Sequence, residues 1–138
     1  MSAKDIFHQI VRSALEKEGW RITNDPLYLK FGDDQLRVDL GAERLIAAER
    51  DREKIAVEVK SFLSPSAISE FHTALGQFLN YRAVLQIQQP DRKLYLAVND
   101  ETYRGFFLRD LPQLSIQMYQ LKLIIFEPKS EVILQWIN

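Results

Sequence analysis

Apolar residues recur at spacings of one and three between Phe7 and Leu15, and this pattern predicts an amphipathic helix near the start of the chain. Ser2-Ala3-Lys4-Asp5 has the pattern of a capping box that would begin the helix, and Gly19 is suited to ending it. His8 lies beside the apolar row, so we expect a surface or half-buried structural histidine rather than a metal ligand.

Alternation of apolar and polar residues predicts a series of short strands after this helix. We expect strands at residues 20–23, 27–31 and 35–40, separated by turns at 24–26 and 32–34. Residues 43–50 fit either a short helix or a strand that enters a turn, and we favour the strand. The clearest strand is 54–60, in which Ile55, Val57 and Val59 share one face while Ala56, Glu58 and Lys60 share the other.

The second half of the chain combines a long helix with further strands. Ser64-Pro65 predicts the start of a helix that runs to about Gln88, which Gly76 could kink or split. A strand at 93–98, short helices after Asn99 and from about Leu111, and a terminal hairpin of 122–126 and 132–137 follow. This order predicts an α/β fold in one domain, 1–138, with a mixed central sheet flanked by helices.

Composition narrows the class of protein. The chain has 138 residues, of which 46% are hydrophobic and 27% charged, as in ordinary globular proteins. It has no cysteine and two histidines, which excludes a disulfide scaffold, a thiol nucleophile and zinc sites of the cysteine or three-histidine type. The net charge of −1 excludes a strongly basic coat but not a local positive face. The chain shows neither a secretory pattern nor a membrane-spanning apolar run, so we expect a cytoplasmic protein with no membrane partner.

Three charged side chains on the polar faces of the predicted strands suggest a chemical site. They are Asp39, Glu58 and Lys60. We expect one strand between those of Asp39 and Glu58, and a strand spacing of about 4.8 Å would still let the two carboxylates converge on one ion. With the carbonyl of Val59 they would form an oxygen-ligand set suited to Mg²⁺ or Mn²⁺. Lys60 could orient a water or stabilise a phosphate, so the set suits phosphodiester hydrolysis.

Two polar residues of the predicted long helix extend this set. Gln77 and Tyr81 are four residues apart, share one helix face, and can donate hydrogen bonds to a phosphate or to a metal-bound water. A structural alternative stays open for each group: Glu58 could pair with Lys60 or Arg37 across strands, and Gln77 and Tyr81 could be the polar edge of an amphipathic helix. The cost of unpaired charge in a central strand favours a functional site.

These residues resemble known families. Asp39, Ala56-Val57-Glu58-Val59-Lys60 and Gln77-Phe78-Leu79-Asn80-Tyr81 are similar to the Asp, Glu-x-Lys and Gln-x-x-x-Tyr elements of the PD-(D/E)xK nuclease superfamily. Longer blocks resemble the XisH family, the fdxN element excision controlling factors of cyanobacteria, and the resemblance covers essentially the whole chain. These blocks are Asp5-Ile6-Phe7-His8, Gly19-Trp20-Arg21-Ile22-Thr23, Asp39-Leu40-Gly41-Ala42-Glu43, Ile55-Ala56-Val57-Glu58-Val59-Lys60-Ser61-Phe62 and Ala74-Leu75-Gly76-Gln77.

The resemblance implies a restriction-endonuclease-like fold and a role in excising a DNA element by site-specific recombination. It also implies a DNA target, a divalent metal and a companion protein of the XisI type. Asp39 and Glu58 match the metal-binding acids of the superfamily, Lys60 the catalytic lysine, and Gln77 and Tyr81 the helix pair.

Three functions stay open on the sequence alone. The first is a Mg²⁺-dependent endonuclease. The second is a catalytically inactive accessory factor that binds DNA or protein and regulates a recombinase, and the third is an interaction module without nucleic acid. A homodimer is compatible with all three.

Several other groups have both a functional and a structural interpretation. Arginines 37, 44, 50 and 52 could hold phosphates or balance the acids between them. We expect Glu16 and Glu18 on a solvated helix face rather than at a metal. The aromatic segment 103–111 is a candidate partner surface, although Tyr103, Phe106 and Phe107 would equally suit a core.

Overall fold

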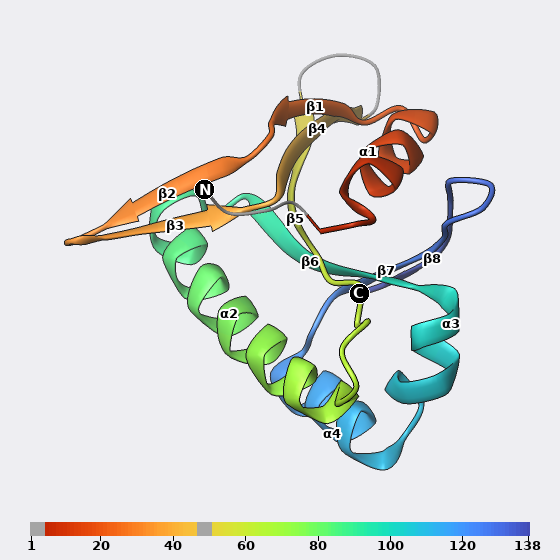
Figure 1. Cartoon of the computed structure of the whole chain (residues 1–138). Coiled ribbons are helices and arrows are strands. Elements are labelled where there is room, and N and C mark those ends of the chain that lie inside the picture. The colour runs from red at the N-terminus through yellow and green to blue at the C-terminus, as the bar shows by residue number, and fades with distance from the viewer. Residues whose placement is uncertain (1–4, 47–50) are drawn as a thin grey trace.

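The structure is a computed structural model and describes residues 5–46 and 51–138 (Figure 1). Its helices are α1 (His8–Lys17), α2 (Ala67–Gln88), α3 (Asp100–Thr102), the π-helical turn η2 (Tyr103–Phe107) and α4 (Asp110–Tyr119). Its strands are β1 (Arg21–Asn24), β2 (Leu27–Phe31), β3 (Asp34–Val38), β4 (Leu40–Ile46), β5 (Asp51–Val59), β6 (Arg92–Asn99), β7 (Leu123–Glu127) and β8 (Val132–Ile137). No helix in these two ranges is both long and apolar enough to cross a membrane.

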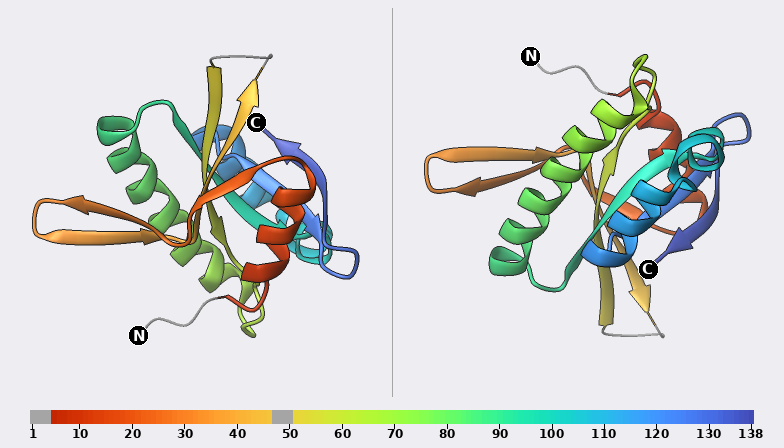
Figure 2. Two further views of the ribbon diagram at one scale, coloured as in Figure 1. Left: turned by 90° about the horizontal axis from the view of Figure 1, so that it is seen from above. Right: turned by 90° about the horizontal axis from the view of Figure 1, so that it is seen from below.

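A six-stranded mixed sheet forms the centre of the fold, with the strand order β1-β4-β5-β6-β7-β8. β5, β6 and β7 run parallel, whereas β4 pairs with β5, and β8 with β7, in antiparallel fashion. Helix α1 covers one face of the sheet, and α2 and α4 lie on the other (Figures 1 and 2). The predicted mixed α/β fold with flanking helices is therefore confirmed.

The alternation of β5 explains its place inside the sheet. Ile55, Val57 and Val59 pack in the apolar cluster beneath α1, and Ala56 packs in the cluster beneath α2. Because both faces of the strand are covered, Glu58 has only 6% of its surface exposed. The predicted strand and its two faces are confirmed, and a carboxyl group is held in the interior of the protein.

The strands β2 and β3 form a separate two-stranded hairpin that projects from the sheet beside α2 (Figures 1 and 2). The turn at its tip contains Gly32 with a positive φ of 61°, a conformation that glycine adopts without steric cost. Leu27 and Leu29 face the cluster under α2, and the side chain of Gln88 donates to the carbonyl of Lys30 at 2.6 Å. The hairpin is therefore held against the last turn of α2.

The path of the chain around Asp39 differs from the prediction in one respect. The expected strand between Asp39 and the Glu58 strand is β4, and it pairs directly with β5, with Leu40 opposite Val57. Asp39 does not belong to a continuous strand 35–40, because the chain bends there to leave the hairpin sheet and enter the main sheet. This bend places Asp39 next to Glu58.

Two local predictions about α2 differ from the structure. Helix α2 begins after Ser66, whose hydroxyl accepts from the Ser69 N–H, so Ser64 is not its cap. Gly76 causes no break, and α2 continues from Ala67 to Gln88. The predicted capping box reaches residues 2–4, which lie outside the described residues, while Gly19 ends α1 with a φ of 89° as expected.

His8 is more buried than we expected. The residue has 3% of its surface exposed, and Nε2 of its ring lies 2.7 Å from Oδ1 of Asp25. The guanidinium of Arg12 donates to Oδ2 of the same carboxylate at 2.7 Å. Because Asp25 lies in the turn before β2, this cluster joins α1 to the base of the projecting hairpin.

Candidate functional site

A polar pocket of about 430 Å³ opens where the base of the hairpin, the end of β5 and the middle of α2 meet. All six residues predicted for the site line this pocket, although they come from three separate segments of the chain. Its lining consists of Asp5, Gln35, Leu36, Arg37, Asp39, Glu58, Val59, Lys60, Gln77 and Tyr81. The predicted set is therefore brought together in space, and its roles remain predictions.

Asp39 and Glu58 hold each other in place through the backbone. The Asp39 N–H donates to Oε1 of Glu58 at 3.1 Å, and the Val59 N–H donates to Oδ2 of Asp39 at 2.8 Å. Both carboxyl groups are buried, with 6% of each residue exposed. One oxygen of each group is thus occupied by a backbone donor, and the orientation of both groups is fixed before any ligand arrives.

The second oxygen of each carboxyl group faces a cation. Nζ of Lys60 lies 3.7 Å from Oε2 of Glu58, and an Nη of Arg37 lies 4.0 Å from Oδ1 of Asp39. These separations exceed a normal hydrogen bond, so neither cation is tightly bound to its acid. Lys60 follows the last residue of β5, and its N–H donates to the Ala97 carbonyl at 3.1 Å, which fixes its backbone against β6.

Glu58 is strongly perturbed by this environment. Burial, followed by the neighbouring charge of Asp39, raises the pKa of Glu58 from 4.5 to about 8, although Lys60 acts in the opposite direction. Glu58 therefore takes up a proton at higher pH than an exposed glutamate does. A perturbed carboxyl group inside a polar pocket is typical of functional sites.

Gln77 and Tyr81 enter the pocket from α2, as their four-residue spacing predicted. Burial, then the charges of Glu58 and Asp39, raise the pKa of the Tyr81 hydroxyl, so it remains a hydrogen-bond donor at neutral pH. The side-chain oxygen of Gln77 is buried and accepts no hydrogen bond from any described residue. Because buried polar atoms are almost always paired, this oxygen is available to a water or a ligand.

Asp5 is a site residue that the sequence did not reveal. It lines the same pocket, and its carboxylate accepts from the N–H groups of Phe7 and Ser61, both at 2.9 Å. It therefore connects the start of α1 to the residue that follows Lys60. Its place in a suggested capping box indicated only a local role, and no spacing in the sequence indicated the contact with Ser61.

The other charged candidates lie elsewhere. Glu16 and Glu18 are exposed as expected, and Glu18 accepts from the indole N–H of Trp136 at 3.0 Å. Arg44 and Arg52 pair with Glu53 and Glu43 across β4 and β5. Of the four arginines, Arg37 alone lines the pocket, and Arg50 lies outside the described residues.

Within the segment 103–111, Phe106 and Phe107 are core residues. Phe106 and Phe107 have 5% and 0% of their surfaces exposed and pack against Phe71 from α2. Apolar residues that are exposed lie within this segment and just after it, namely Leu108, Leu111, Leu114 and Met118. The interpretation of Phe106 and Phe107 as core residues is therefore confirmed.

The donor set fits a hard divalent cation bound with waters. Oδ1 of Asp39 and Oε2 of Glu58 are the oxygens that no backbone donor occupies. Two carboxylates that repel each other in a buried setting gain from a cation between them. The described residues contain no group of three or more acids and histidines arranged around a common centre. Mg²⁺ commonly binds through one or two carboxylates and keeps several waters.

Fold and site together define a mixed α/β protein with a paired-carboxylate and lysine pocket at the carboxyl end of the interior strand β5. The XisH protein family matches residues 1–134, and the chain belongs to this family. An XisH family protein from Nostoc punctiforme PCC 73102 is 56% identical, with a TM-score of 0.89, over 97% of this chain and 100% of that one. A fdxN element excision controlling factor protein from Anabaena variabilis is 51% identical, with a TM-score of 0.87, over 98% and 100%. Among curated proteins, none matches.

Proposed function

We propose that this protein is a cytoplasmic, Mg²⁺- or Mn²⁺-dependent endonuclease-like factor that acts on DNA during excision of a DNA element. The observation that carries the proposal is the arrangement of Asp39, Glu58 and Lys60 in one pocket, with one oxygen of each acid unoccupied by the backbone. The name of the Anabaena variabilis relative, an excision controlling factor, supports the biological role. The resemblance of Asp39, Glu-x-Lys and Gln-x-x-x-Tyr to PD-(D/E)xK nucleases supports the chemistry.

Asp39 and Glu58 would hold the cation, with the carbonyl of Val59 as a further ligand. A divalent ion bound there supplies the Lewis acidity that favours attack of water on a phosphodiester. Glu58 must release its proton for the site to load, so metal affinity should rise with pH through about 8. The site is therefore expected to bind metal weakly at pH 6 and well at pH 9.

The remaining side chains would bind and orient the phosphate. Lys60 carries a positive charge 3.7 Å from Glu58 and can donate to a phosphate oxygen as the charge there develops. Tyr81 remains protonated and Gln77 has an unpaired amide oxygen, so the pair can position a phosphate and an attacking water. In hydrolysis the oxygen of the attacking water would form a bond to phosphorus, the bond from phosphorus to the leaving oxygen would break, and the proton lost by the attacking water would be balanced by one that the leaving oxygen takes from solvent.

The test combines metal binding with cleavage. Isothermal titration of the full chain with Mg²⁺ and Mn²⁺ between pH 6 and 9 should show binding that strengthens with pH. Asp39→Asn and Glu58→Gln should lose this binding, whereas Glu16→Gln, which changes an exposed acid outside the pocket, should retain it. A plasmid-nicking assay should detect cleavage that requires the metal and is lost in Lys60→Met. The proposal fails if the wild-type protein binds neither ion over this pH range.

A second candidate is an accessory factor that uses the same pocket without hydrolysis. The observations in its favour are that the described residues contain no group of three or more acids and histidines that could hold a metal ion, and that burial raises the pKa of Glu58 to about 8. In this case Lys60→Ala would leave excision of the element intact in cells. The endonuclease proposal requires the same variant to abolish excision.

A further inference from the structure

We propose that the outer face of the β2–β3 hairpin is a binding surface for double-stranded DNA. DNA bound to this face would have its phosphate backbone at the pocket. The inference rests on the proposed function, because it names the part of the protein that holds the substrate beside the site. It concerns four side chains that share one face of the hairpin. These are Tyr28, Lys30, Gln35 and Arg37.

The hairpin has two different faces. Leu27, Leu29 and Val38 are buried and pack in the cluster beneath α2. On the opposite face, Tyr28 pairs with Arg37 and Lys30 pairs with Gln35. In a strand, alternate residues point to opposite faces, so these two pairs lie side by side on the solvent side. Tyr28 is a large aromatic residue, yet 56% of its surface is exposed to solvent.

This outer face is continuous with the pocket. Gln35 and Arg37 line the pocket, and Tyr28 and Lys30 are their cross-strand neighbours. With a rise of about 3.3 Å per residue, the face extends the polar surface about 7 Å from Arg37 to Gln35, toward the hairpin tip. A chain of phosphates that enters the pocket would therefore lie along the hairpin on its way in.

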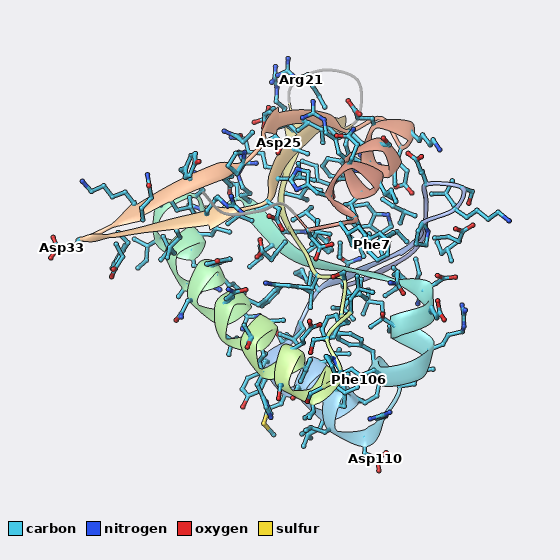
Figure 3. The ribbon with its side chains drawn as sticks, viewed as in Figure 1. Phe7, Arg21, Asp25, Asp33, Phe106 and Asp110 are labelled. Carbon is cyan, nitrogen blue, oxygen red and sulfur yellow. The ribbon has the colours of Figure 1, made fainter. Side chains whose placement is uncertain are left out.

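The charges on the outer face suit a polyanion. Lys30 is exposed and forms no ion pair with another residue in the ranges 5–46 and 51–138. Arg37 is 4.0 Å from Asp39 and keeps donors for a second partner. The two acids of the hairpin do not lie on the outer face. Asp33 is at the tip and points away from the molecule (Figure 3). Asp34 pairs with Phe31, and both positions belong to the opposite face of the hairpin.

The shape of the hairpin also suits a duplex. A two-stranded β-ribbon fits the major groove of B-DNA, where lysine, arginine and glutamine are the residues that contact guanine and adenine edges. This ribbon is preorganised, because its inner face is packed and Gln88 holds the Lys30 carbonyl. Binding therefore costs little ordering of the backbone.

The experiment measures duplex binding separately from the pocket. Fluorescence anisotropy with a labelled duplex, in EDTA to prevent cleavage, compares the wild type with Tyr28→Ala/Lys30→Ala and with Lys30→Glu. The double variant should bind the duplex at least about tenfold more weakly than the wild type. Loss of the Lys30 contact should also reduce the slope of the logarithm of the association constant against the logarithm of the salt concentration by about 0.9. Lys129→Ala is the matched control, since the β7–β8 turn that contains Lys129 lies across the molecule from the hairpin (Figure 1).

Metal titration of the same variants separates this inference from the proposed function. The hairpin variants should bind Mg²⁺ or Mn²⁺ like the wild type, because neither Tyr28 nor Lys30 lines the pocket. If metal binding and cleavage occur but Tyr28→Ala/Lys30→Ala and Lys30→Glu bind the duplex like the wild type, the hairpin inference is wrong and the proposed function stands. If the hairpin variants lose DNA binding while the wild type binds no metal, the inference stands and the endonuclease proposal fails. A wild-type protein without affinity for the duplex overturns the inference.

Discussion

The buried carboxyl group of Glu58 makes the stability of this protein depend on pH in an unusual direction. Most acids are ionised more easily in the folded state, whereas burial and Asp39 raise the pKa of Glu58 to about 8. The folded protein thus keeps a proton that the unfolded chain releases near pH 4.5. This group therefore lowers the free energy of unfolding as the pH rises from about 4.5 to 8, and its effect is constant above that range.

Glu58→Gln isolates this effect. The amide keeps an oxygen for the Asp39 N–H but cannot ionise, so the variant resembles the protonated wild type. The difference between a pKa of 4.5 and one of about 8 corresponds to a loss of about 5 kcal/mol in the free energy of unfolding when the pH is above both values. The pKa of about 8 already includes the effect of Lys60, and because the pocket is open to solvent, which screens charge, we expect Glu58→Gln to gain about 2–5 kcal/mol over the wild type between pH 5 and pH 9.

Urea denaturation in EDTA at pH 5, 7 and 9 measures this difference, because the other titrating groups are common to both proteins. Glu53→Gln is the control, since it changes an acid of the same strand that lies outside the pocket and pairs with Arg44 at 2.8 Å. It should show no gain toward high pH. A difference between Glu58→Gln and the wild type that does not change from pH 5 to pH 9 would refute the reasoning. Mg²⁺ at pH 9 should stabilise the wild type and not the variant.

Three further predictions concern the scaffold around the site. Asp25→Asn should lower the free energy of unfolding by about 1–3 kcal/mol in urea titrations, because it removes the negative charge that His8 and Arg12 contact. An unchanged free energy of unfolding would mean that this cluster does not stabilise the fold. Phe107→Ala should cost about 3–5 kcal/mol, seen as a lower thermal midpoint, because the ring is fully buried; a loss under 1 kcal/mol would contradict close packing there. Ser66→Ala should cost about 1 kcal/mol in urea titrations by removing the cap of α2, whereas Ser64→Ala should cost clearly less if Ser66 is the true cap.

Local patterns in the sequence were sufficient to predict most elements. The alternation in β5 indicated a strand covered on both faces, and it placed Glu58 and Lys60 on the same side. The four-residue spacing of Gln77 and Tyr81 placed both on the pocket side of α2. These features follow from the periods of the strand and the helix, which the order of residues determines directly.

Contacts between distant segments were less predictable. Asp5 reaches Ser61, 56 positions further along the chain, and His8 reaches Asp25 across the base of the hairpin. The cap of α2 is Ser66 rather than Ser64, although both are serines next to a proline. In each case several residues of suitable chemistry were available, and packing of the complete fold selected one of them.

The sequence by itself determined most of the strands and helices, and it indicated that Asp39, Glu58 and Lys60 form a site. Only the tertiary structure decided that β4 pairs directly with β5 in the register Leu40 opposite Val57, and that the chain bends at Asp39. Those two features bring the acids of Asp39 and Glu58 within reach of the same ligand. The reason is physical: a local period sets the face on which a side chain lies, whereas the register between strands depends on the packing free energy of the whole sheet.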